Sequence, residues 1–322
     1  MLYNILAIVG GFVLLVWSAD RFIIGAAATA RNLNISPLII GLTIVGFGTS
    51  APEMLVSSIA AINESPGLAI GNALGSNIAN ITLVLGMAAL IKPLDVHSRI
   101  LKKELPLLMM ATVLLLMLLQ DGQLGRTDGV ILLSSLLLLL WWVARQAVTN
   151  READAMYDEF DQEMPAPMPM QRSLFWLVIG LILLVGASRI LVWGAVEMAT
   201  TFGVSDLLIG LTIIAVGTSL PELAASIAGA LKNEHDIAIG NVVGSNMFNT
   251  LAVMGIPGLI YPSTLDSIVL DRDMPIVFIL TISLFIMAYG FKGFGRVNRL
   301  EGAVLLSCFL GYQALLYITE IL

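Results

Sequence analysis

The feature that most constrains this chain is a series of apolar runs, each about as long as the ~20 residues that cross the hydrocarbon core of a bilayer. Ten such runs follow one another with short polar breaks. With 58% apolar and 12% charged residues, the 322-residue chain holds more apolar side chain than one soluble core buries. We therefore expect an all-α polytopic membrane protein with spans at Tyr3–Phe22, Pro37–Ile62, Gly67–Ile91, Leu105–Leu119, Gly129–Val143, Leu174–Val196, Leu207–Leu231, Ile237–Ile260, Met274–Gly290 and Leu300–Leu322.

The basic residues divide unequally between the two sets of loops that ten spans define. One set holds 13 of the 16 Lys and Arg residues, and the other holds only Arg126, Arg189 and Arg272. Short loops rich in Lys and Arg are retained in the cytoplasm. This division predicts that both termini lie outside and that the segment 146–172 lies in the cytoplasm.

The chain contains an internal repeat with one constant offset, the spacing between Leu38 and Leu207. Without a gap, residues 38–80 match residues 207–249 at 21 of 43 positions, and the identities include Gly, Thr, Ser, Pro, Glu and Asn as well as apolar residues. Each half holds five spans, an odd number, so the second half enters the membrane from the opposite side. Inverted repeats are the usual construction of secondary transporters, which bind their substrate near the midplane.

The repeat divides the chain into three parts. We expect a first five-helix repeat at 1–145, a linker at 146–172 and a second five-helix repeat at 173–322. The linker is acidic and contains three prolines, but it lacks the spacing of an EF-hand, so it is interpreted as a solvated segment. Cys308 is the only cysteine, which excludes an internal disulfide and a Cys metal cluster. The net charge of −7, without a basic face, favours no nucleic-acid partner.

Two acidic residues lie deep within apolar spans. Glu53 ends the string Gly-Thr-Ser-Ala-Pro-Glu, and Glu222 ends the matching string Gly-Thr-Ser-Leu-Pro-Glu. A carboxylate at the bilayer centre costs at least ~2.5 kcal/mol even on the lenient insertion scale. Neither span contains a Lys or Arg. A bound cation is therefore the natural partner of these acids.

The proline before each acid predicts a broken helix. Pro52 and Pro221 have no N–H, so the carbonyls of Gly48 and Gly217 lose their helical donors, and the carbonyls around them become neutral oxygens beside each Glu. Hard cations such as Na⁺ and Ca²⁺ bind carboxylate, carbonyl and hydroxyl oxygens. We expect spans two, three, seven and eight to be broken around such a site.

Hydroxyl and amide residues extend the pattern. Residues four apart share one helical face, which groups Thr49 with Glu53 and Ser57, and likewise Thr218 with Glu222 and Ser226. Taken singly, such residues are more often hydrogen-bonding partners between helices, and a proline is more often a plain kink. That interpretation leaves unexplained two acids without basic partners and the same polar string in both halves.

The two strings resemble the α-repeats of the Ca²⁺/cation antiporter superfamily, in particular the sodium/calcium exchangers of its compact bacterial branch. The resemblance implies a protein of the bacterial inner membrane that transports Ca²⁺ and Na⁺, needs no cofactor and has no obligatory protein partner. It implies that Glu53 and Glu222 hold Ca²⁺ with the Thr49 and Thr218 carbonyls, while hydroxyls and amides complete Na⁺ sites. The ion ligands implied by motif position are Thr49, Ser50, Glu53, Ser76, Asn80, Thr218, Ser219, Glu222, Ser245 and Asn249.

Asn249 departs from part of that family, in which several members carry Asp. Asn77 and Asn246 are expected to position neighbours. Two other functions remain open from the sequence: a Ca²⁺/H⁺ antiporter on the same scaffold, in which the acids are protonated in exchange for Ca²⁺, and a gated cation channel. An intramembrane enzyme is the weakest alternative, because no nucleophile–base pair or His cluster lies in the spans.

Overall fold

The computed structural model describes residues 2–33, 35, 37–64, 66–96, 101–149, 168–201, 215–289 and 295–321, and most of them are helical. Helices of the first half occupy the first five predicted spans. Three short stretches there, η1, η2 and η3, are not α-helical: η1 and η2 are π-helical and η3 is a 3-10 turn. The elements are α1 (Leu2–Leu33), α2 (Pro37–Ile40), η1 (Gly41–Val45), α3 (Gly46–Thr49), α4 (Ala51–Ile62), α5 (Pro66–Ala79), η2 (Asn80–Leu85), α6 (Gly86–Ile91), α7 (Leu101–Leu118), η3 (Leu119–Asp121) and α8 (Arg126–Thr149).

Helices of the second half follow the same order, although residues 207–214 of the predicted seventh span lie outside the described residues. The π-helical stretches here are η5 and η6. The elements are α10 (Met170–Thr201), α12 (Ala215–Thr218), α13 (Leu220–Leu231), α14 (His235–Phe248), η5 (Asn249–Val253), α15 (Gly255–Ile260), η6 (Val269–Asp273), α16 (Met274–Tyr289) and α17 (Arg299–Ile321).

The helices confirm a polytopic membrane protein. Seven of the described helical runs are long and apolar enough to cross a bilayer, and the bent pair Gly41–Thr49 and Ala51–Ile62 makes an eighth. The described α13 and α16 are shorter, with 12 and 16 residues. One predicted end was wrong: α1 runs for 32 residues, to Leu33, well past Phe22, and α10 has the same length. A helix of that length measures about 48 Å, so it exceeds the ~30 Å hydrocarbon core.

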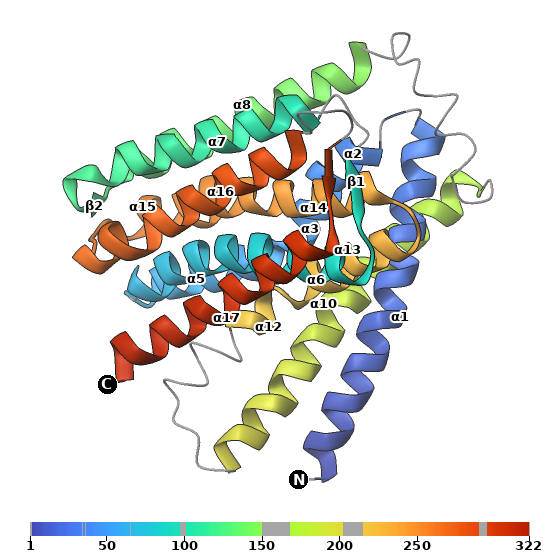
Figure 1. Ribbon diagram of the computed structural model, residues 1–322, viewed down its shortest axis with the longest axis horizontal. Helices are drawn as coiled ribbons and strands as arrows, with labels where there is room; N and C mark the ends of the chain where they lie inside the picture. Colours follow the sequence, from blue (N-terminus) through green and yellow to red (C-terminus); the bar gives the residue numbers. More distant parts are fainter. Residues whose placement is uncertain are drawn as a thin grey trace.

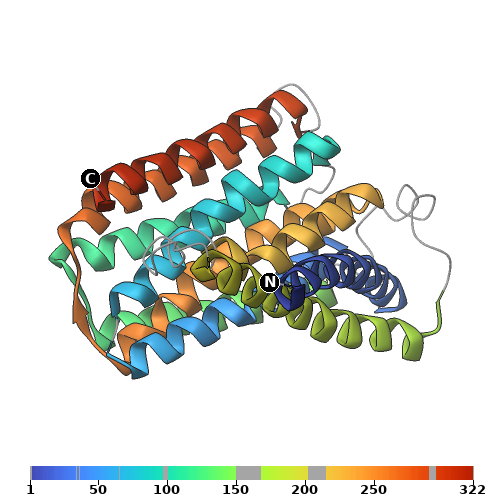
Figure 2. The same ribbon diagram turned by 90° about the horizontal axis from the view of Figure 1, so that it is seen from below.

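α1 and α10 pack along each other and cross the remaining helices steeply (Figures 1 and 2). The rings of Trp17 and Trp176 meet edge to face at 6.0 Å. The amide of Asn32 donates to the hydroxyl of Ser173 at 3.2 Å. The pair has its own apolar cluster, which reaches the rest of the molecule through residues such as Ala225 of α13. The two long helices therefore form one unit that lies against the others.

Two short strand pairs join the halves at opposite ends of the other helices. β1 (Leu94–Val96) pairs antiparallel with β4 (Gly295–Val297), and β2 (Gln123–Leu124) pairs with β3 (Ser263–Thr264). The labels β1 and β2 mark the two ends in Figure 1.

Side-chain contacts strengthen the β1 end and add the residue Asn233 after α13 to it. Asp95 pairs with Arg296 at 3.0 Å, and Lys92 donates to Asn233. These contacts bring together segments that the basic-residue count places on one side of the membrane.

The internal repeat is visible in the backbone. The break between α3 and α4 falls at Ser50 (φ −80°, ψ 2°), and the break between α12 and α13 falls at Ser219 (φ −87°, ψ 5°). π-helical stretches begin at Asn80 and at Asn249. Two of the non-glycine residues with positive φ are likewise one repeat apart, Glu64 (56°) and Asn233 (64°). The offset within each of these pairs is the same as that between the two copies of the sequence repeat.

The expected breaks take two forms. The chain bends by 48° at Ser50, as predicted for span two. The predicted breaks in spans three and eight were wrong: Pro66–Ile91 and His235–Ile260 each run as one helical segment. Their irregular part is the π-helical stretch, which adds a residue to the turn without interrupting the helix.

Candidate cation site

The two acids of the repeated strings lie at matching places in the fold. Glu53 is in the first turn of α4 and Glu222 is in the first turn of α13, each directly after its helix break. Both side chains are fully buried, and the two carboxyl groups lie close enough to interact electrostatically. No ion pair to either acid occurs among the described residues. Two like charges are thus held together without a basic neighbour.

The carboxyl group of Glu222 accepts hydrogen bonds from hydroxyl groups of both halves. The hydroxyl of Ser50, in the first half, donates to Glu222 Oε1 at 3.1 Å. Within the second half, the hydroxyl of Ser245 also donates to Glu222 Oε1, at 3.4 Å. The acids and hydroxyls of the two repeats therefore form one site.

The predicted ligands lie in the interior, and some of them are in contact: Ser50 and Ser245 with Glu222, and Thr49 with Ser245. Thr218 is half-buried and the other nine are buried. Several of their polar atoms have no hydrogen-bond partner among the described residues, and native proteins seldom leave buried polar atoms so. These atoms are both carboxyl oxygens of Glu53, Oε2 of Glu222, Oγ of Ser219, and the oxygen and nitrogen of the Asn80 and Asn249 amides.

This donor set fits a hard cation. It contains two carboxylates with neutral hydroxyl and amide oxygens, which are the ligands that Na⁺ and Ca²⁺ prefer. Groups of three or more His, Cys, Asp or Glu side chains that suit a metal ion are absent from the described part of the chain. Neutral oxygens must therefore complete any coordination shell around the two acids.

The main-chain oxygens differ in part from the prediction. The carbonyl of Gly217 accepts a hydrogen bond from the hydroxyl of Ser188 in α10 at 2.9 Å. The carbonyl of Gly46 accepts the N–H of Ser50 at 3.1 Å. The expectation that every carbonyl in these stretches is a free oxygen beside its Glu was therefore wrong for these two, because neighbouring groups use one lone pair of each.

Sequence reasoning assigned no role to Asn72 and Asn241, which the structure places beside the acids. The amide of Asn72 donates to the main-chain oxygen of Glu53 and to the hydroxyl of Ser57, both at 3.0 Å. That of Asn241 donates to the main-chain oxygen of Glu222 at 3.2 Å and to the hydroxyl of Ser226 at 2.8 Å. The signal in the sequence was that the two asparagines occupy the same position of the two repeats.

A close backbone crossing supports the site. A Cβ on Gly244 of α14 would lie 2.2 Å from the carbonyl oxygen of Leu42 in η1, and one on Gly46 would lie 3.1 Å from the backbone of Gly244. Glycine at this crossing lets the two main chains touch. Because Ser245 follows Gly244, the crossing brings its hydroxyl to the break between α3 and α4.

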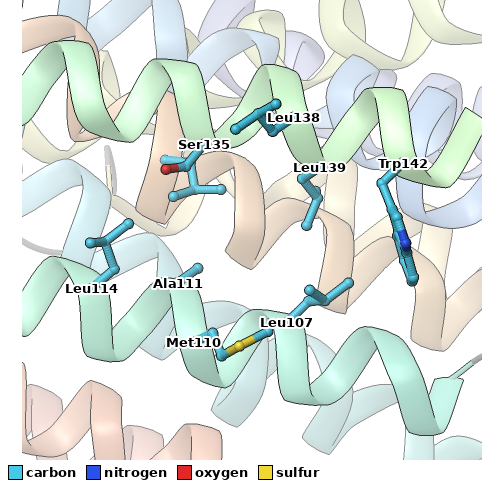
Figure 3. A pocket seen from close by; sticks show the side chains of 9 residues that line it. Leu107, Met110, Ala111, Leu114, Ser135, Leu138, Leu139 and Trp142 are labelled. Carbon is cyan, nitrogen blue, oxygen red and sulfur yellow. The ribbon is translucent and has the colours of Figure 1, made fainter.

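A cavity of about 340 Å³ between α7 and α8 is lined by apolar side chains, including Leu107, Met110 and Trp142 (Figure 3). The hydroxyl of Ser135, its one polar lining side chain, already bonds to Ile131 O at 2.7 Å. The cavity supplies no ligand for an ion.

A helical membrane protein that buries two unpaired carboxylates among hydroxyls and amides, contributed by two repeated segments, has the construction of a secondary cation transporter. The family model for the sodium/calcium exchanger protein matches residues 3–145 and 172–318. The chain belongs to this family of cation exchangers.

Similar proteins cover the chain from end to end. CaxA of Alkalimonas amylolytica, which is named as an antiporter, is 49% identical over 98% of this chain and 99% of its own. The inner membrane protein YrbG of Escherichia coli is 41% identical over 98% of each chain. The solved structure of the sodium-calcium exchanger NCX_Mj superposes with a TM-score of 0.83 at 30% identity, covering 100% of this chain and 99% of the other.

Proposed function

We propose that the chain exchanges Ca²⁺ for Na⁺ across the membrane, and that both ions bind in turn at the site between Glu53 and Glu222. The observation that carries the proposal is the pair of fully buried acids without basic partners, surrounded by oxygen atoms that lack hydrogen-bond partners among the described residues. One Ca²⁺ neutralises the two carboxylates, and several Na⁺ ions bound by the same cluster replace that charge.

The same electrostatics favour exchange over leak. Without a cation, the site leaves two carboxylates in a medium of low dielectric constant, where uncompensated charge is costly. The unloaded protein therefore has a high barrier to changing the side on which the site is open. Only a site loaded with Ca²⁺ or Na⁺ crosses, which couples the two fluxes.

For the membrane arrangement we propose ten spans in two inverted repeats, at 1–145 and 173–322, joined by the cytoplasmic linker 146–172, with both termini outside. The recurrence of helix breaks and π-helical stretches at one constant offset supports the repeat. The family match also falls into two segments, on either side of the linker. The name of the Escherichia coli relative supports the inner membrane as the location.

Alternating access requires one part of the molecule to move against another. The α1–α10 unit is suited to be that part, because it crosses the other helices steeply and has its own apolar cluster (Figure 1). It also reaches the site, since Ser188 of α10 donates to the carbonyl of Gly217. We propose that this unit moves and that the remaining helices of the two repeats stay fixed.

Purified protein in sealed vesicles tests the function. Radioactive Ca²⁺ uptake is measured with an outward Na⁺ gradient, then with a K⁺ gradient, then with a pH gradient, each imposed alone at clamped voltage. We expect uptake only with the Na⁺ gradient. Uptake driven by the pH gradient without Na⁺ would establish the Ca²⁺/H⁺ antiporter instead, and uptake without any counter-ion would establish a channel.

A further inference from the structure

The hydrogen bonds around Asn241 fix the direction in which its side-chain amide points. The main-chain oxygen of Glu222, 3.2 Å from the amide nitrogen, only accepts hydrogen bonds. The NH₂ group must therefore face Glu222, and the amide oxygen must face the opposite way. That oxygen lies 3.1 Å from the hydroxyl oxygen of Thr49, in the other half of the chain. Because an amide oxygen cannot donate, Thr49 is the donor.

When Thr49 donates to Asn241, this bond sets where the lone pairs of the Thr49 hydroxyl point. The Thr49 hydroxyl has a single hydrogen and four acceptors within reach: the carbonyls of Val45 and Gly46, the amide oxygen of Asn241 and the hydroxyl of Ser245. A hydroxyl that binds a cation must turn its hydrogen away from the ion and its lone pairs toward it. Asn241, in α14 of the other half, is an acceptor outside the helix of Thr49 that can take this hydrogen.

Donation by Thr49 to Asn241 also restricts the hydrogen bonds of the Ser245 hydroxyl. Once Thr49 donates to Asn241, the Thr49 oxygen acts only as an acceptor toward Ser245, 3.4 Å away. Ser245, whose hydroxyl donates to Glu222 Oε1, then has the Thr49 oxygen as a second acceptor within reach. Ser50 donates to the same carboxyl oxygen at 3.1 Å. The orientation of one amide thereby limits the directions open to both the Thr49 and the Ser245 hydroxyls.

We propose that Asn241 is a positioning residue for cation binding, which holds the backbone of Glu222 and turns the lone pairs of Thr49 toward the ion. This inference rests on the proposed cation site. Asn241 is completely buried, and all polar groups of its side chain are used. Its amide nitrogen donates two hydrogen bonds to groups of α13, and its amide oxygen accepts one from Thr49 of α3. Asn72 holds the backbone of Glu53 in the same way, so the device occurs once in each half.

Equilibrium binding of radioactive Ca²⁺ to purified protein in detergent, combined with Ca²⁺ flux in vesicles, tests the proposal. Asn241→Leu keeps the approximate volume and removes every hydrogen bond. We expect the Ca²⁺ concentration for half-saturation to rise by roughly two- to tenfold, since the hydrogen bonds of Asn241 join neutral groups and each is worth about that factor. The maximal flux per folded molecule should change much less. Asn72→Leu should give a similar rise through Glu53.

A double-mutant cycle separates positioning from a general loss of stability. Thr49→Val alone should weaken binding, and adding it to Asn241→Leu should weaken binding no further than the larger single effect, because both act on the same hydroxyl. Thr281→Val is the matched control: it removes a buried hydroxyl that bonds within its own helix, at 2.8 Å to Val277 O, and should leave half-saturation unchanged.

The possible results separate the positioning role of Asn241 from the existence of the cation site. Unchanged half-saturation in folded Asn241→Leu, or effects that multiply in the double mutant, would overturn the positioning role while leaving the cation site standing. If the wild-type protein binds no Ca²⁺, the proposed function and this inference both fail. Should Asn241→Leu not fold, Asn72→Leu carries the test, and unchanged binding there contradicts the proposal.

Discussion

Ser50, in the first half of the chain, donates its hydroxyl hydrogen to carboxyl oxygen Oε1 of Glu222 in the second half, at a distance of 3.1 Å. Both residues are completely buried. The acid of one repeat is therefore held by a hydroxyl that stands at the helix break of the other repeat. One half alone cannot form this arrangement, so the functional unit is the paired repeat.

Replacing Ser50 by Ala should weaken Ca²⁺ binding. A hydrogen bond to a charged group contributes about 1.5–3 kcal/mol, so half-saturation should rise by roughly tenfold or more. Ser58→Ala is the control, because the half-buried Ser58 hydroxyl bonds to Met54 O in its own helix at 2.6 Å. Ca²⁺ dependence of flux in vesicles measures both variants, and equal half-saturation in the two would contradict a role for the Ser50–Glu222 bond.

The sequence predicted some of the residues that meet, because the two copies of the polar string and its continuation contain Ser50, Glu222 and Ser245, which are in contact. It did not predict which partner each residue has. Ser50 is 172 residues from Glu222, and Thr49 is 192 residues from Asn241. Spacing along one helix reports only neighbours on that helix, so contacts between the halves require the packing of the fold.

Other features depended on packing as well. The Pro-based argument found the bend at Ser50, but it could not predict that spans three and eight continue through π-helical turns at Asn80 and Asn249. The end of α1 was missed because hydropathy marks the part of a helix that fits the hydrocarbon core, and a helix of 32 residues is longer than that.

Gly244→Ala should disrupt the site through packing alone. The added methyl would lie 2.2 Å from the Leu42 carbonyl oxygen, so one backbone must move. Overpacking of this kind costs typically about 1–3 kcal/mol. We expect a lower thermal melting temperature and weaker Ca²⁺ binding. The control is Gly311→Ala in exposed α17, where a methyl meets no described atom within 4 Å. Equal stability of the two variants would contradict the close crossing.

Pro52→Ala should be milder than any change to the acids. It restores a backbone donor, which reseals the helix toward the Gly48 carbonyl and reduces the 48° bend at Ser50. We expect slower Na⁺-driven Ca²⁺ flux with transport retained. Pro106→Ala, within α7, provides a proline control away from the repeated strings. Loss of flux in the control but not in Pro52→Ala would argue against a functional break.

Transport should be independent of K⁺. Ca²⁺ and K⁺ bound together bring three positive charges, whereas Glu53 and Glu222 supply two negative ones, and both Asn80 and Asn249 are neutral. Uncompensated charge is costly in a buried site. The measurement is Na⁺-driven Ca²⁺ flux with K⁺ present or replaced by choline at clamped voltage, and a requirement for K⁺ would refute the expectation.

Asn249→Asp provides the converse of the K⁺ experiment. Asn249 is completely buried, and neither polar atom of its amide has a hydrogen-bond partner among the described residues. A carboxylate there adds a third negative charge next to the proposed ligands. We expect tighter cation binding or a new stimulation by K⁺. Unchanged Ca²⁺ affinity together with unchanged K⁺ independence would place Asn249 outside the site.

The most direct test of the central claim, that the transported Ca²⁺ binds between the two buried acids, is Ca²⁺ uptake by Na⁺-loaded vesicles containing Glu53→Gln or Glu222→Gln. Glutamine keeps the shape of each side chain and removes the charge that the ion requires. Glu64→Gln, at an exposed acid between α4 and α5, is the control. We expect each buried variant to be folded and to lose uptake, while the control transports as the wild type does. Retained uptake in either folded buried variant would contradict the two-acid site.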